Sequence, residues 1–265
     1  MSSWRSSHLL VNFVGSVLVG LLVLPIVVLI GVSFNAGVEQ VFPPHGFSLR
    51  WYANLANRQG FLDAAKLTLA LALGSACISV LVSLGAGVAI TRYRFPGRDF
   101  LLTLLLSPLI VPQVVVGMAF LVTLSALGIF NSIVSLSLLH CVITLPFALR
   151  VVVAALQVHP ASIEEAAQSL GASPVRAFFG VTVPQIAPGL LAAGVFAFVT
   201  SFENFTASQF LVWDRTTLPI AIYTSVQTEN DPTAAALSSL IVAAVIVFIA
   251  VFNRFVVRHM LAGRT

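Results

Sequence analysis

The sequence predicts an all-α integral membrane protein with six transmembrane helices. Hydrophobic residues make up 58% of the 265 residues and charged residues only 8%, and the mean hydropathy of +1.03 is far above that of a soluble domain. A helix needs roughly 20 apolar residues to cross a hydrocarbon core, and every backbone polar group must be satisfied inside its own segment. Six stretches meet this requirement within one membrane domain, residues 1–265, at approximately 9–34, 61–90, 100–124, 133–156, 185–212 and 233–252.

The first stretch, 9–34, is expected to be a retained helix rather than a secretory signal. It is longer than the apolar core of a signal peptide, and no clear small-x-small cleavage site precedes Asn35. The next stretch, 61–90, is apolar along most of its length. It carries the only lysine of the chain, Lys66, near its beginning.

Prolines are expected to break the third and fourth stretches. Pro108 and Pro112 lie in the third, and Pro146 lies in the fourth. Each proline removes a backbone donor and crowds the preceding helical turn. Irregular backbone at membrane depth occurs where it is buried in protein or lines a water-filled cavity. The sequence leaves open whether these prolines line a path or only kink packed helices.

The distribution of basic residues predicts that both termini are cytoplasmic. Cytoplasmic loops carry an excess of Lys and Arg, and this orientation places nine of the thirteen on the inner side against four on the outer side. The inner residues are Arg5, Arg92, Arg94, Arg98, Arg150, Arg176, Arg254, Arg258 and Arg264, and the outer ones are Arg50, Arg58, Lys66 and Arg215. The same orientation puts residues 158–184 in the cytoplasm.

Residues 158–184, hereafter the 158–184 segment, form a polar, helix-forming island between the fourth and fifth stretches. Ser162 and Glu165 have the spacing of a capping box at a helix start. Gly171 suits the left-handed position that ends a helix. Ser173 followed by Pro174 supplies a second N-cap and a first-turn proline. The sequence therefore predicts a helix, a sharp turn and a second helix.

The motif in this segment resembles the coupling loop of a transporter family. It consists of Glu-Ala-Ala at 165–167, Gly171 after three residues, and an apolar-x-apolar-Pro run whose Pro184 is expected to end the second helix. This pattern resembles the cytoplasmic loop of binding-protein-dependent ABC importer permeases. The alternative interpretation is that Glu165 only caps its own helix.

The resemblance implies a type I ABC importer permease fold in a cytoplasmic (inner) membrane, with a coupling helix. It also implies a homologous second permease subunit, two ATPase subunits that bind ATP and Mg, and an extracytoplasmic solute-binding protein, with no cofactor in this chain. The residues that it places in contact with the ATPase are Glu164, Glu165, Ala166, Ala167 and Gly171.

The fifth stretch carries a polar stripe that predicts part of a solute path. Thr200, Glu203, Asn204 and Ser208 recur at helical spacing. An acidic residue inside a span is costly to bury against lipid and is by default a pathway or pairing residue. A carboxylate facing the path would favour a cationic solute. The alternative is that Glu203 is neutralised by protonation or by a neighbour such as Lys66.

Two predicted outer segments, residues 42–52 and 213–232, and the run Ser201-Phe202-Glu203-Asn204 resemble the permeases of spermidine/putrescine importers. The resemblance implies a small cationic organic solute, and it makes 213–232 a docking or gate loop. Tandem acidic residues are expected at the fifth-stretch site, but Asn204 follows Glu203 here. Amino acid, phosphonate, ferric iron and thiamine importers therefore stay open as alternatives.

Several other function classes lack support in the sequence. With a single lysine in Ala64-Ala65-Lys66-Leu67, the chain has no phosphate-binding loop and is not expected to hydrolyse ATP. The arginines are scattered over membrane loops, which argues against nucleic acid as a partner. A secondary transporter would need several intramembrane ionisable groups or an inverted repeat, and a purely structural subunit would not need the 158–184 segment.

Overall fold

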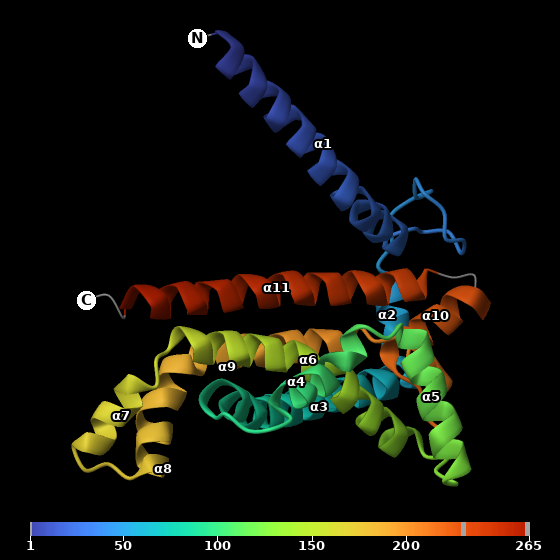
Figure 1. Ribbon diagram of the computed structural model, residues 1–265. Helices are drawn as coiled ribbons and strands as arrows, with labels where there is room; N and C mark the ends of the chain where they lie inside the picture. The colour runs from blue at the N-terminus through green and yellow to red at the C-terminus, as the bar shows by residue number, and fades with distance from the viewer. Residues whose placement is uncertain (1, 229–231, 263–265) are drawn as a thin grey trace. The chain divides into compact units, whose positions relative to one another are not determined.

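The computed structural model describes residues 2–228 and 232–262, and these residues are helical nearly throughout. Within these ranges the only extended pairing is one isolated bridge between Asn35 and Phe47. The chain forms two compact units (Figure 1): residues 1–61 with 222–265, and residues 62–221.

The first unit contains α1 (Ser2–Ser33), α2 (Arg50–Leu55) and α11 (Thr233–Ala262), and α11 packs against both of the others. The link between α1 and α2 is organised by Asn35. Its carbonyl oxygen accepts a hydrogen bond from Trp51 Nε1 at 2.8 Å, and its side-chain Oδ1 accepts from the backbone N–H groups of Gly37 and His45. The irregular link therefore has polar partners of its own.

The remaining helices follow one another through the second unit, except that residues 59–61 of the first of them and residues 222–228 of the last belong to the first unit. They are α3 (Gln59–Arg92), α4 (Arg98–Leu106), η1 (Ser107–Leu109), α5 (Gln113–Ala126), α6 (Ser132–Val158), α7 (Ser162–Ser169), α8 (Pro174–Ala177), the π-helical turn η2 (Phe178–Thr182), α9 (Val183–Phe202), η3 (Ser208–Phe210) and α10 (Leu218–Thr228).

The packing of α6 against α9 forms the centre of the second unit. Small side chains such as Ala148 and Ala193 are fully buried there. At Gly189 an added Cβ would lie only 2.5 Å from the Cβ of Ala155, so the two backbones approach as closely as glycine permits. Close approach through small residues is a common way for helices to pack in membranes. The pair α6 and α9 carries the 158–184 segment between its ends.

Among the residues that the structure describes, four helices are long and apolar enough to cross a membrane, and they correspond to predicted stretches one, two, four and five. The third stretch is divided into Arg98–Leu109 and Gln113–Ala126, which meet at an angle of 101°; counted as one broken span, this pair brings the number to five. The sixth stretch lies in α11, whose apolar part within the described side chains, Thr233–Phe248, is shorter.

The predicted breaks are confirmed in the third stretch and wrong in the fourth. Pro112 is the N-cap of α5, and the chain bends between η1 and α5. In contrast, α6 continues through Pro146, which is buried. One proline removes one donor from a long, well-packed helix, whereas Pro108 and Pro112 remove donors from successive turns.

The predicted fifth helix, 185–212, has different ends in the structure. The helix begins earlier, because α8, η2 and α9 run together from Pro174 to Phe202. It also ends ten residues earlier than predicted, at Phe202, and the chain turns before η3.

Candidate functional site

The 158–184 segment folds as predicted around its turn and projects beyond α6 and α9 (Figure 1). Gly171 has a φ of +94° and ends α7 in the left-handed conformation. Ser173 is the N-cap of α8, and its Oγ accepts a hydrogen bond from the N–H of Arg176 at 3.3 Å, with Pro174 in the first turn. A short, fixed turn therefore separates the two helices.

Two predicted details of this segment are wrong. The N-cap of α7 is Ala161, without a side-chain cap, so Ser162 lies inside the helix and the capping box with Glu165 does not form. Pro184 does not end a helix but stands in the first turn of α9. A proline is tolerated there because the wide π turn of η2 precedes it and the local backbone hydrogen bonding is already altered.

Glu164 faces the protein interior and joins a polar triad with Arg92 and Thr182. Arg92 Nη1 donates to Glu164 Oε2, and Thr182 Oγ1 donates to the same oxygen at 2.5 Å. Arg92 Nη2 also lies 3.4 Å from Thr182 Oγ1. The Arg92 and Glu164 side chains are only 14% and 12% exposed. No pattern in the sequence marked Arg92 or Thr182 as members of this site.

The triad keeps Glu164 ionised. Partial burial acts to raise the pKa of this carboxyl group, but the hydrogen bonds from Thr182 and Arg92 and the positive charge of Arg92 together outweigh burial. The net effect is a pKa below the ordinary value of glutamate. The contact with Arg92 is therefore an ion pair at neutral pH.

Other side chains of the segment are exposed, and large apolar ones are among them. Glu165, Ala166 and Gly171 are exposed, and Ala167 is half-buried. Leu170 is 91% exposed and Val175 is 68% exposed. Apolar surface of this kind, presented next to polar side chains, is typical of a protein interaction site.

The four predicted path residues do not form one helical stripe, because α9 ends before most of them. Thr200 lies in α9 and is half-buried, Glu203 is the C-cap, and Asn204 and Ser208 are buried beyond the helix end. Asn204 Oδ1 accepts hydrogen bonds from the N–H and Oγ of Ser208 at 3.1 and 2.8 Å. This local side-chain contact offers the backbone an alternative to further helix.

Of the four predicted path residues, Glu203 is the one with an exposed side chain. Its side chain is exposed, and it has no hydrogen bond or ion pair among the side chains that the structure describes. Lys66, the neighbour that the sequence suggested, instead pairs with Asp63 at 3.1 Å in an exposed position. The carboxylate of Glu203 thus stays available to a group from outside the chain.

A buried polar network involves Ser201 and Asn204, on either side of Glu203 in the sequence, and no sequence pattern predicted it. His140 of α6 contacts Ser201 Oγ through Nδ1 at 2.6 Å and Ser208 Oγ through Nε2 at 3.0 Å. Asn204 Nδ2 extends the network by donating to Gln113 Oε1 at 2.9 Å. The network connects the irregular backbone after α9 with the first turn of α5, so the two broken regions support each other.

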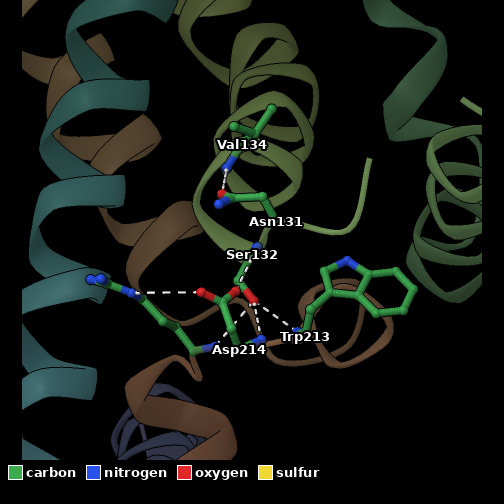
Figure 2. Close-up of polar contacts among 6 residues, drawn as sticks. Asn131, Ser132, Val134, Trp213 and Asp214 are labelled. Carbon is green, nitrogen blue, oxygen red and sulfur yellow. Dashed lines mark hydrogen bonds and ion pairs between the residues drawn. The ribbon is translucent and has the colours of Figure 1, made fainter. Parts of the chain in front are cut away.

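Residues 213–215, the segment before α10, are hydrogen-bonded to the N-terminus of α6, as Figure 2 shows. Ser132 Oγ accepts hydrogen bonds from the backbone N–H groups of Trp213, Asp214 and Arg215 at 2.7, 3.1 and 3.2 Å. In return, Asp214 Oδ1 accepts from the N–H of Ser132 at 3.0 Å. This last bond is the largest cause of the lowered pKa of Asp214. The predicted docking or gate loop is therefore anchored at its first residues.

Residues 79–261 match a protein family described as "Binding-protein-dependent transport system inner membrane component". The matched region includes α6, α9, the 158–184 segment and Glu203. The chain belongs to this family. It is accordingly a multi-pass permease component of an ABC importer, and the family resemblance seen in the Glu-Ala-Ala motif is confirmed.

Relatives within the family match this permease over most of its length. It is 30% identical to the putrescine transport system permease protein PotI of Escherichia coli (strain K12), over 92% of this chain and 87% of the relative. It is also 30% identical to the spermidine/putrescine transport system permease protein PotC of the same organism, over 92% of both chains.

Solved structures confirm the type I permease fold. The permease matches a chain of a bacterial ABC transporter involved in the import of the acidic polysaccharide alginate, with a TM-score of 0.72, 16% identity and coverage of 96% of this chain and 97% of that chain. It also matches a chain of the MetNI methionine ABC transporter, with a TM-score of 0.58, 19% identity and coverage of 75% and 94%. At these identities the likeness concerns the fold alone.

Proposed function

We propose that this permease forms part of the translocation path of an ATP-driven importer for polyamines, which an extracytoplasmic binding protein delivers. The observation that carries the proposal is the open carboxylate of Glu203, in a chain whose relatives PotI and PotC are named as putrescine and spermidine/putrescine permeases. Thr200, on the preceding turn of α9, is the further path residue that we propose.

Electrostatics at the end of α9 favour a cation. Glu203 is the C-cap of α9, so its negative charge adds to the partial negative charge of the free carbonyl groups at a helix C-terminus. Asn204 and Ser208 make hydrogen bonds within the chain. The Glu203 carboxylate is therefore the group of this site that can bind a cation. Asn204 and Ser208 therefore shape the path by holding the backbone, and Glu203 supplies the attraction for an ammonium group.

The solute is tested first on the cognate binding protein. We expect putrescine or spermidine to raise its melting temperature, while thiamine, a phosphonate, ferric iron and neutral amino acids leave it unchanged. Stabilisation by one of these other solutes, with no effect of putrescine or spermidine, would refute the polyamine assignment. The family membership would stand, because it rests on the sequence match.

We further propose that the exposed side of the 158–184 segment binds a separate ATPase subunit, which binds ATP and Mg. Glu165, Ala166 and Gly171 lie on that side beside the apolar surface of Leu170 and Val175. Ala167, in the same helix as Glu165 and Ala166, is half-buried. Two ATPase subunits, one for this permease and one for a homologous second permease, complete the proposed assembly.

The ATPase contact is tested by Leu170→Asp. A charge in the apolar part of an interface is costly, so this variant should lose the ATPase on purification. It should still reach the membrane, because Leu170 is exposed in the permease itself. Leu127→Asp is the matched control, since Leu127 is also exposed but lies at the C-cap of α5, on the predicted outer side. Retention of the ATPase by Leu170→Asp would refute the contact.

The proposed orientation places both termini and the 158–184 segment in the cytoplasm. In a chain lacking Cys77 and Cys141, a cysteine replacing Ser173 should react with a membrane-impermeant thiol reagent only after the cells are opened. A cysteine replacing Arg215, whose side chain is 61% exposed, should react in cells whose outer envelope is permeable. The reverse labelling pattern would invert the orientation.

A further inference from the structure

We propose that the polar triad of Arg92, Glu164 and Thr182 transmits movement of α7 to the membrane helices α3 and α9. Glu164 is then a positioning residue inside the permease rather than a contact residue for the ATPase. The inference rests on the proposed docking of the ATPase on the 158–184 segment, because that docking supplies the movement to be transmitted.

The triad joins three elements that are far apart in the sequence. Arg92 is the last residue of α3, Glu164 lies in the first turn of α7, and Thr182 is the last residue of η2, directly before α9. Each side chain contacts the other two. Through the chain itself, α7 is connected only to α6 and, across the turn at Gly171, to α8. The triad therefore adds a direct connection from α7 to α3 and a shorter one to α9.

The contacts are of a kind that resists displacement. Hydrogen bonds between ionised partners are stronger than neutral ones, and the low exposure of Arg92 and Glu164 limits screening by salt. The helix dipoles add to the attraction, because Arg92 lies at a C-terminus and Glu164 at an N-terminus. A rigid-body shift of α7 would therefore carry the end of α3 with it.

The π turn gives Thr182 its place in the triad. A π turn inserts one residue into an α-helix, and one residue corresponds to a rotation of about 100° around the helix axis. The hydroxyl group of Thr182, which is buried, points at Glu164. Without the inserted residue, a helix continuing from Pro174 would present a different side chain to the carboxylate.

Adjacent glutamates thus have different tasks. Consecutive helical residues point about 100° apart, and Glu164 is turned inward whereas Glu165 is exposed. We assign the partner contact to Glu165 and the internal connection to Glu164. Substitutions at the two positions should therefore fail in different ways.

The test uses the complete importer, with its ATPases and binding protein, reconstituted in liposomes. Solute uptake and ATP hydrolysis are measured in the same vesicles. Glu164→Gln should keep the ATPase bound but lower the uptake per ATP hydrolysed about tenfold, as expected for losing a charge-assisted hydrogen bond. Thr182→Val, which keeps both charges, should lower the ratio less. Lys66→Gln is the matched control, because it breaks an ion pair whose side chains are 75% and 71% exposed, and it should leave the ratio unchanged.

A double-mutant cycle tests whether Arg92 and Glu164 act through their contact with each other. Arg92→Gln should lower the ratio like Glu164→Gln, and the double variant should be no worse than the more affected single variant, since one interaction is removed in each case. Losses that multiply in the double variant would overturn the proposal. An unchanged ratio in Glu164→Gln would overturn it as well.

Purification of the variants distinguishes a wrong ATPase contact from a wrong role of the triad. If Leu170→Asp keeps the ATPase, the contact is wrong. If Leu170→Asp loses it and Glu164→Gln loses it to the same extent, Glu164 contacts the ATPase directly and the triad proposal is wrong. Should the variants that remove a charge not accumulate in the membrane, Thr182→Val decides, and a normal uptake ratio in that variant overturns the proposal.

Discussion

Ser132→Ala should release the segment before α10 from the N-terminus of α6. In the structure, Ser132 Oγ accepts hydrogen bonds from three consecutive backbone N–H groups, those of Trp213, Asp214 and Arg215 (Figure 2). Alanine removes this acceptor and leaves the backbone bond from the N–H of Ser132 to the Asp214 carboxylate in place. The variant therefore loosens the segment without removing its second attachment.

The size of the effect follows from the geometry. A net hydrogen bond contributes about 0.5–1.5 kcal/mol, and a buried donor left without a partner costs about 1–3 kcal/mol. The three donors share one oxygen, and the side chains of Asp214 and Arg215 are 54% and 61% exposed, against 38% for Trp213. The shortest bond, from Trp213 at 2.7 Å, therefore dominates. We expect a local loss of stability of about 1–3 kcal/mol, which corresponds to a roughly 5- to 150-fold larger equilibrium constant for local opening.

Hydrogen exchange of the assembled importer measures this opening. The amides of residues 213–215 should exchange faster in Ser132→Ala by the factor given above. Ser135→Ala is the matched control, since Ser135 is equally buried one turn later in α6, and its hydroxyl has no hydrogen-bond partner in the part of the chain that the structure describes. Unchanged exchange at 213–215 in Ser132→Ala, or an equal increase in Ser135→Ala, would refute the anchoring role.

Three further predictions concern single positions. Glu203→Gln should lower uptake of a cationic solute and leave assembly unchanged, because it removes the charge and keeps the shape. Equal uptake by wild type and variant would refute the attraction of the solute by Glu203. Gly117→Ala should destabilise the protein by about 1–3 kcal/mol, since its Cβ would lie 2.6 Å from the carbonyl oxygen of Ala207. In contrast, Gly74→Ala meets no atom within 4 Å and should be neutral or stabilising in the same thermal melt. Finally, the lowered pKa of Glu164 means that its ionised form stabilises the fold at neutral pH, and this contribution is lost as the pH falls through the lowered pKa. The melting temperatures of wild type and Glu164→Gln should therefore differ most at neutral pH and converge in acid, and a difference that does not change with pH would contradict the ion pair.

The sequence by itself determined the membrane class, the family and the turn of the 158–184 segment. These features depend on local properties: apolar length, the left-handed preference at Gly171, and the capping geometry of Ser173 with Pro174. The break near Pro112 belongs to the same group, because two prolines one turn apart remove backbone donors whatever surrounds them.

Only the tertiary structure decided which polar groups face each other. Helical spacing placed Glu203, Asn204 and Ser208 on one stripe, but the side chain of Asn204 bonds to Ser208 and the helix ends at Phe202. The ion pair of Glu164 joins it to Arg92, 72 positions away in the chain. Periodicity describes neighbours along one helix and carries no information on which other helix lies opposite. That arrangement is set by the close packing of α6 on α9 and by the π turn before α9, neither of which the sequence pattern revealed.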